Sequence, residues 1–356
     1  MVSCRVVWQD VDGDTPLIVA CNMEDEQLAA HLLTSGCRVD AAGYEANTAL
    51  HRAADSGNVA LVRLLVDHDA DTTLTNAAAN TPLMVACDSG HVDVVRYLLQ
   101  HSPTAADSPR PLQCANADGR TCLHLAAVAG SVELADLLLE AGVSAYEVDA
   151  AGNTALVLAV WSRNFDLASA LLRAAAAGSC GLADYVNLPG ELGRGVIHWA
   201  AVHGVVPLLD ELWAAVGGRL AVDGRDTAGD TPLVLAARAG HAPALRWLLD
   251  RGLCAVNWRG DGGRTALHWA VLVADRDAVE YLLAIDGVAP ALGDQDGCTP
   301  LLLAAAHHRY AEMRTILRTV GGSDADVDRQ DADGRTALHW VCKVRRHHHA
   351  LYSTRK

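Results

Sequence analysis

The chain has 356 residues, so at roughly 150 residues per domain its length alone allows two or three domains. Its 28 Lys and Arg residues stand against 43 Asp and Glu residues, a formal net charge of −15. This acidic balance argues against a general nucleic-acid binder and against a polybasic membrane-surface protein. Only one Phe is present and aromatic residues make up 4% of the chain, so a core must come mainly from Ala, Leu and Val, the residues of closely stacked helices.

The amino-terminal residues 1–10 hold no apolar stretch long enough for a signal peptide. No run of about 18 apolar residues, the length that spans a membrane, follows later in the sequence. We therefore expect a protein of the cytoplasm or the nucleus that does not insert into membranes. The ten cysteines form no Cys-x-x-Cys pair and match no zinc module, which favours reduced thiols that act as small apolar residues.

One phrase recurs along the chain: Thr, usually Pro or Ala, Leu, two further residues and Ala. Its ten copies, of which the sixth lacks the Thr, begin at Thr15, Thr48, Thr81, Thr121, Thr154, Gly195, Thr231, Thr265, Thr299 and Thr336. Thr is a good helix N-cap and Pro suits the first helical position. A Gly or small polar turn, a second apolar stretch and a Gly- and Asp-rich connector follow. Each copy therefore predicts a helix, a turn, a helix and an extended loop.

This phrase and its basic spacing of 33 residues resemble the ankyrin-repeat family, whose units carry Thr-Pro-Leu-His-x-Ala. The resemblance covers roughly residues 10–342 and implies an all-α solenoid of stacked antiparallel helix pairs with β-hairpin-like loops. We assign 1–342 to one array of ten repeats, the last of them incomplete, with inserts near 102–116 and 174–192. Because no single unit can bury its own apolar face, stability must come from stacking between neighbours.

Two features depart from the pattern. The sixth copy has Gly195 in place of Thr, and losing the cap should weaken its helix by about 0.5–2 kcal/mol. Residues 343–356 form a basic tail without the second apolar helix that a tenth repeat would need. This tail is a polar cap of the array, a binding tail, or the end of a truncated reading frame.

Every second copy carries a His three residues after its first position. These residues are His51, His124, His198, His268 and His339. At about 10 Å per unit they are too far apart to surround one metal ion, and the resemblance implies that they bond to neighbouring backbone. Residues 347–349 are three further histidines, near Cys342 and His339, that could hold a transition metal, although an incidental basic tail is favoured. No phosphate-binding, dinucleotide-binding, calcium-binding or catalytic motif is present, so we expect no cofactor and no enzyme activity.

The resemblance implies that partners contact the loop tips and the concave face formed by the first helices. The candidate loop residues are Tyr44, Asp118, Arg120, Asp230, Arg264, Asp296 and Arg335. The candidate first-helix anchors are Trp161, Trp199, Trp269 and Trp340, because Trp is a favoured interface residue. The competing interpretation is that these tryptophans pack against one another along the stack. Trp213 and Trp247 fall on second helices and are expected in the core.

The sequence therefore predicts a monomeric scaffold or adaptor that recognises a protein partner. The alternative is the ankyrin targeting portion of a larger or truncated enzyme, such as a ubiquitin ligase, a kinase or a palmitoyltransferase. Residues 1–340 carry 23 basic and 43 acidic side chains, a net of −20, whereas the last 16 residues carry five basic and no acidic ones. A partner with a basic surface, or the tail itself, could therefore bind the acidic array. The context of Asn187 resembles that of hydroxylated ankyrin asparagines.

Overall fold

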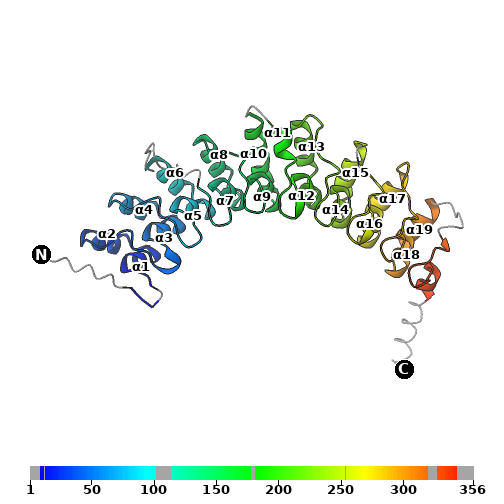
Figure 1. Ribbon diagram of the computed structural model, residues 1–356, viewed down its shortest axis with the longest axis horizontal. Coiled ribbons are helices and arrows are strands. Elements are labelled where there is room, and N and C mark those ends of the chain that lie inside the picture. The colour runs from blue at the N-terminus through cyan, green and yellow to red at the C-terminus, as the bar shows by residue number, and fades with distance from the viewer. Residues whose placement is uncertain are drawn as a thin grey trace, which may run out of the picture. The chain divides into compact units, whose positions relative to one another are not determined.

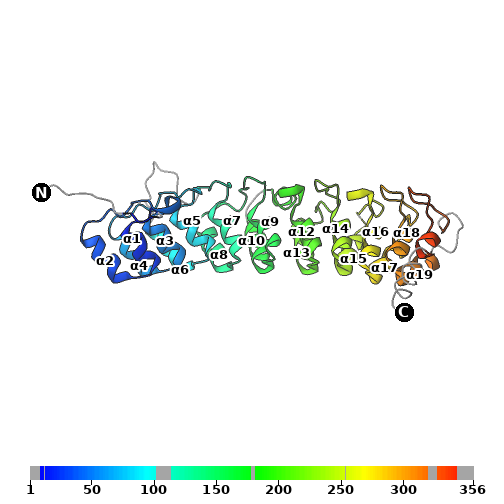
Figure 2. The ribbon, with the colours of Figure 1, turned by 90° about the horizontal axis from the view of Figure 1, so that it is seen from below.

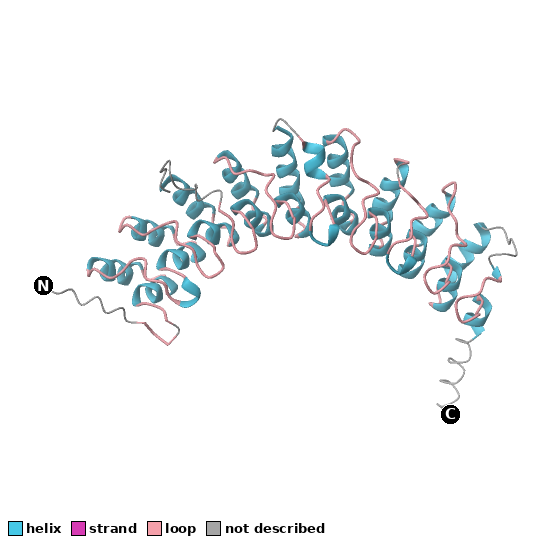
Figure 3. Ribbon diagram, in the orientation of Figure 1, coloured by secondary structure: helices cyan, strands magenta, loops and turns pink. Residues whose placement is uncertain are grey.

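The computed structural model describes residues 9–11, 13–101, 114–177, 181–252, 254–319 and 327–342. The chain forms two compact units, Met1–Leu182 and Ala183–Lys356. Helices joined by loops make up both of them (Figure 3), and the described ranges contain no β-strand. One isolated bridge joins Val148 to Thr154. The predicted all-α fold is confirmed.

The described residues of unit 1 form five helix pairs, in which we call the first helix inner and the second outer. The inner helices are α1 (Pro16–Asn22), α3 (Ala49–Ser56), α5 (Pro82–Asp88), α7 (Cys122–Ala129) and α9 (Ala155–Trp161). The outer helices are α2 (Glu26–Thr34), α4 (Val59–Val66), α6 (Val92–His101), α8 (Val132–Glu140) and α10 (Phe165–Ala177). Each outer helix packs on its own inner helix, and each inner helix packs on the next one (Figure 1).

Unit 2 repeats this arrangement after the short helix α11 (Leu182–Val186). Its inner helices are α12 (Val196–His203), α14 (Pro232–Ala239), α16 (Ala266–Val273) and α18 (Pro300–Ala306). Its outer helices are α13 (Val206–Ala215), α15 (Ala242–Asp250), α17 (Arg276–Ala284) and α19 (Tyr310–Thr319). A further helical stretch at 337–342 begins the tenth copy. Most of the first insert (102–113) and the whole basic tail (343–356) lie outside the described residues. The count of ten repeats therefore stays a prediction.

The loops lie along one edge of each unit (Figure 2) and are tied to their neighbours. The Asp226 N–H donates to the Asp230 carbonyl at 2.9 Å and closes one loop, and the Thr227 N–H donates to the Leu192 carbonyl of the preceding loop at 2.8 Å. In the described ranges three loops tighten into 3₁₀ turns, η1 (Tyr44–Ala46), η3 (Glu191–Gly193) and η4 (Asp261–Gly263). The loops therefore form a connected edge beside the inner helices.

The repeated phrase works as its chemistry predicts. In odd copies the Thr hydroxyl accepts the N–H three residues later, as Thr81 does from Met84 at 3.3 Å. In the even copies from the second to the eighth the His joins two repeats. In the eighth, the Thr265 N–H donates to His268 Nδ1 at 3.1 Å, and His268 Nε2 donates to the Cys298 carbonyl of the next loop at 3.1 Å. Burial lowers the pKa of His268 to about 4. These contacts confirm the structural interpretation of this histidine.

The sixth copy accommodates its missing Thr. His198 still accepts the Gly195 N–H at 3.2 Å and bonds through Nε2 to the Gly224 carbonyl at 3.1 Å. A Cβ on Gly195 would lie 2.9 Å from the Leu188 carbonyl oxygen. The preceding loop thus occupies part of the space that a Thr side chain would need, beside a small hollow of about 220 Å³.

Candidate protein-interaction surface

Three tryptophans of unit 2 occupy the same position of the repeat, and each lies against an arginine five residues before it. The pairs are Arg194–Trp199, Arg264–Trp269 and Arg335–Trp340, with the guanidinium carbon 5.2, 5.1 and 5.0 Å from the ring centroid. We call these pairs the Arg–Trp ladder. In each pair the arginine ends the loop and the tryptophan lies on the inner helix, because the N-cap turns the chain back over its own first turn.

Buried carboxylates of the next loop hold two of these arginines in place. Arg194 Nε lies 2.9 Å from Asp226 Oδ2, and Arg264 Nε lies 3.3 Å from Asp294 Oδ2. The two aspartate side chains are only 1% and 2% exposed. A guanidinium held by a buried carboxylate at one edge and by an indole on one face loses little further freedom when it binds a ligand. The sequence reasoning missed Arg194 and both aspartates, although the recurrence of Arg before the phrase in even copies was a usable signal.

Trp269 has a second arginine and an unused donor. The Arg238 guanidinium carbon lies 4.6 Å from its ring centroid, and Arg238 also pairs with Asp230 at 3.4 Å. The indole Nε1 of Trp269 is buried without a hydrogen-bond partner. By contrast, Trp340 Nε1 donates to Asp331 at 2.9 Å, nine residues before it.

A glycine explains the difference between these two tryptophans. The residue nine before Trp269 is Gly260, where a Cβ would lie 2.0 Å from Asp230 Oδ1. That oxygen accepts the Asp261 N–H at 2.8 Å and so fixes the 3₁₀ turn η4. No side chain fits there, so Trp269 has no acceptor of the kind that serves Trp340.

The same contacts correct one predicted site residue. Asp230 was expected at a loop tip open to a partner, but it is fully buried and its carboxylate serves the next loop. Burial raises its pKa. Asp230 therefore supports the neighbouring turn and is out of reach of a partner.

The remaining predicted residues fall in both units. In unit 1, Tyr44 is half exposed on η1, Asp118 is exposed, and Arg120 lies 3.7 Å from the buried Asp149. Trp161, at the end of α9, is 48% exposed. In unit 2, Asp296 is exposed, and Arg335 pairs with Asp333. The structure brings together only the residues of the Arg–Trp ladder and their aspartates.

The two tryptophans expected in the core, Trp213 and Trp247, pack against each other on the outer helices. There Trp213 meets Trp247 edge-on, with ring centroids 6.1 Å apart, and Trp247 is 6% exposed. Trp247 Nε1 donates to Asp210 at 2.7 Å, and Arg251 covers the Trp247 ring at 3.6 Å. On the inner helices, Trp199 stacks on His203 of its own helix, with ring centroids 6.2 Å apart. Trp199, Trp269 and Trp340 each pack against an arginine and remain partly exposed.

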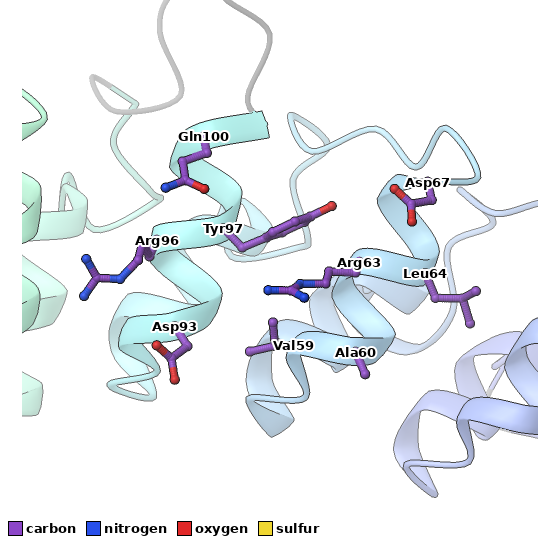
Figure 4. Close-up of a pocket in the computed structure, with 9 residues that line it drawn as sticks. All are labelled: Val59, Ala60, Arg63, Leu64, Asp67, Asp93, Arg96, Tyr97 and Gln100. Carbon is purple, nitrogen blue, oxygen red and sulfur yellow. The ribbon is translucent and has the colours of Figure 1, made fainter.

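A second concavity lies on the outer helices of unit 1, between α4 and α6 (Figure 4), with a volume of about 770 Å³. Arg63 extends from α4 toward α6, where its guanidinium carbon lies 5.4 Å from the Tyr97 ring centroid. Arg96 points away from α4 and pairs with Glu133 at 3.1 Å. Two arginines and two aspartates line this hollow, so its charge favours no particular ligand.

The other sequence candidates are placed more simply. The Asn187 side chain bridges two loops, donating to the Arg219 carbonyl at 2.9 Å and accepting the Ala221 N–H at 2.8 Å. Histidines 347–349 lie outside the described residues, and the part of the chain that the structure does describe holds no cluster of three metal-binding side chains. In that same part, no helix is both long and apolar enough to cross a membrane.

Comparison with known proteins agrees with this geometry. A family model of ankyrin repeats (three copies) matches residues 2–76, 71–149, 107–180 and 197–290. Neurogenic locus notch homolog protein 1 of Mus musculus is 37% identical over 119 residues, and that of Xenopus laevis is 40% identical over 121 residues. Neurogenic locus notch homolog protein 2 of Homo sapiens is 38% identical over 120 residues. Each match covers 33% of this chain but only 4–5% of the relative.

Proposed function

The chain belongs to the ankyrin-repeat family, and from this membership we propose that it is a protein–protein interaction scaffold or adaptor without catalytic activity of its own. Ankyrin repeats typically mediate contacts between proteins. The observation that carries the proposal is the Arg–Trp ladder, where partly exposed indoles and fixed arginines share one face of the inner helices. Trp and Arg are the residue types that most often dominate binding energy at interfaces.

The partner is a protein, recognised by the inner-helix face and the loop tips; the chain acts as a monomer in the cytoplasm or the nucleus and binds no nucleic acid. The two units differ in formal net charge, which supports different binding roles for them. Residues 1–182 carry nine Lys and Arg against 22 Asp and Glu, a formal net charge of −13, whereas residues 183–356 carry 19 against 21, a net of −2. A partner with a basic surface is therefore attracted chiefly to unit 1.

A second candidate function keeps the same binding role inside a longer protein. The matched segment makes up only 4–5% of the notch relatives, which shows that repeats of this kind occur within much larger chains. In that case the array is the targeting portion of an enzyme such as a ubiquitin ligase, a kinase or a palmitoyltransferase. The length of the chain recovered from native cells distinguishes the two candidates.

Affinity purification from native cells with mass spectrometry tests the proposal. The baits are the wild-type chain, the double variant Trp199→Ala/Trp269→Ala, and the control Tyr281→Ala. Tyr281 lies on the outer helix α17 under Arg246, whose guanidinium carbon is 5.2 Å from its ring centroid, so the control removes a similar contact from the other face. We expect a protein that the wild type and the control retain and the double variant loses. No specific partner, or equal recovery by all three baits, would contradict the proposed surface.

A further inference from the structure

We propose that the Arg–Trp ladder of unit 2 binds an extended acidic peptide, with one carboxylate at each of the pairs Arg194–Trp199 and Arg264–Trp269. This inference rests on the proposed function and adds the chemistry of the partner segment. The ladder, rather than the acidic surface of the chain as a whole, then selects the ligand.

The first argument concerns the atoms that each arginine leaves available. Arg194 and Arg264 both bind their buried aspartates through Nε, the nitrogen nearest the side-chain stem. Their terminal nitrogens lie beyond that bond, and the side chains are 19% and 30% exposed. A carboxylate can accept two N–H bonds from such a guanidinium. The buried aspartate and the indole have already fixed its orientation, so little side-chain entropy is lost on binding.

The second argument concerns the charges that an approaching ligand meets. The loops and inner helices of the sixth to eighth copies expose Arg225, Arg238 and Arg259. The aspartates that compensate the ladder arginines lie beneath them, almost fully buried. The exposed carboxylates of the same loops are Glu191, Asp223, Asp261 and Asp296, and Asp223 already accepts the Ala255 N–H at 3.0 Å. Exposed arginines and exposed carboxylates are thus about equal in number beside the ladder, whereas unit 1 carries a formal net charge of −13.

The third argument is the spacing of the two pairs. They lie two repeats apart, on α12 and α16, with α14 packed between these helices. At about 8–10 Å per helix layer, the separation is roughly 16–20 Å. An extended chain advances about 3.3 Å per residue. The ligand that fits therefore has two acidic residues five or six positions apart.

Trp269 adds a hydrogen-bond donor to this site. Its indole N–H is buried and unpaired, and Arg238, whose side chain is 44% exposed, covers its ring. A backbone carbonyl of the ligand that displaces Arg238 would satisfy this donor. An unpaired buried donor is costly, so the new bond favours the complex at the second pair more than at the first.

Fluorescence anisotropy on the full chain tests the proposal, with a labelled ten-residue Gly/Ser peptide that carries two Glu residues six positions apart. The control peptides carry Gln or Lys in place of Glu, or place the two Glu residues two positions apart. We expect the six-spaced Glu peptide to bind at least tenfold more tightly than each control peptide, and the binding to weaken with salt. Equal binding of the Gln peptide, or tighter binding of the Lys peptide, would overturn the proposal.

Variants of the same chain locate the binding. Arg194→Lys/Arg264→Lys keeps a positive charge for each buried aspartate but loses the planar fork, and should weaken binding about tenfold. Arg246→Lys, on the outer helix α15, is the matched control and should bind within twofold of the wild type. Trp269→Phe is the second ladder variant, used should the double variant lower the melting temperature. Equal losses in ladder and control variants would place the peptide elsewhere and refute the proposal.

Three further outcomes are informative, and the last two separate this inference from the proposed function. A single-stranded oligonucleotide that displaces the peptide at equal charge concentration would show a general polyanion site and refute a peptide-specific one. If native partners still depend on Trp199 and Trp269 while the acidic peptide does not bind, the proposed chemistry is wrong and the scaffold function stands. If native partners are also independent of the ladder, both fail.

Discussion

The Leu188 carbonyl oxygen lies where the side chain of a helix-capping Thr would begin in the sixth copy, 2.9 Å from the position of a Cβ on Gly195. The loop between α11 and η3 occupies this space. Gly195 is therefore required by its neighbour, and the missing cap is part of a locally consistent structure.

A first prediction follows for this position. Gly195→Thr restores the phrase of the other copies but places side-chain atoms against the Leu188 carbonyl. We expect it to lower the free energy of unfolding by about 1–3 kcal/mol, as overpacking usually does, although a regained N-cap would by itself stabilise the helix. Urea denaturation of the two proteins measures this. A variant more stable than the wild type would show that the loop moves aside at little cost.

Acid should weaken the junctions that the buried histidines make. Burial lowers the pKa of His268 to about 4, and it also lowers the pKa values of His51, His124 and His198. These histidines bind a proton near pH 6.5 in the unfolded chain, but in the folded chain only at a lower pH. Their contribution to the free energy of unfolding is therefore complete above pH 6.5 and is lost as the pH falls toward 4. For His268 the loss at pH 5 is about 2 kcal/mol.

Urea midpoints at pH 7.0 and pH 5.0, for the wild type and for His268→Gln, measure this effect. The variant should be less stable at pH 7.0, but its urea midpoint should change less between the two pH values than that of the wild type. If the urea midpoint changed by the same amount between pH 7.0 and pH 5.0 in the variant and in the wild type, His268 would not resist protonation in the folded chain.

The buried aspartate beneath the ladder should matter more than the exposed one beside it. Asp226 accepts Arg194 Nε at 2.9 Å and the N–H groups of Ala228 and Asp230 at 3.0 and 2.8 Å. Asp226→Ala leaves these donors unpaired and should cost about 2–4 kcal/mol of unfolding free energy. The control Asp261→Ala removes a carboxylate that is 54% exposed and should cost less than about 1 kcal/mol. Similar losses in both variants would refute this account of the loop.

Cysteine labelling should follow burial. Cys37 and Cys342 are exposed, whereas Cys21 and Cys87 are buried; burial raises the pKa of Cys21 to about 12 and that of Cys87 well above its usual range. Under native conditions we expect iodoacetamide to modify Cys37 and Cys342 and to leave Cys21 and Cys87 unmodified until urea is added. Mass spectrometric peptide mapping reads each site. Rapid native labelling of Cys87 would contradict the packing of α5.

The helices were predictable from the sequence because the residues that start and stop them are local. Thr81 caps the start of α5 and the turn at Gly130 ends α7, and each effect depends on a few neighbouring residues. The contacts between loops were not predictable in the same way. Asp230 looked like a loop tip, and its burial depends on Gly260, thirty residues later in the sequence.

The tryptophans show the same limit. Their residue type and their place on first helices were sufficient to select Trp199 and Trp269, but not to show what covers them. Their arginines are five residues earlier in the chain and are fixed by aspartates of the next loop, Asp226 and Asp294. Periodicity within a repeat contains no information about such pairs, because they form only when two repeats stack.

Hydroxyl-radical footprinting of the full chain, with and without its purified native partner, tests most directly whether the ladder is the partner surface. Trp199 and Trp269 are partly exposed on inner helices, and Tyr281 lies on an outer one. We predict that the partner reduces oxidation of Trp199 and Trp269 severalfold and leaves Tyr281 unchanged. Unchanged oxidation of both tryptophans in a saturated complex would contradict the account.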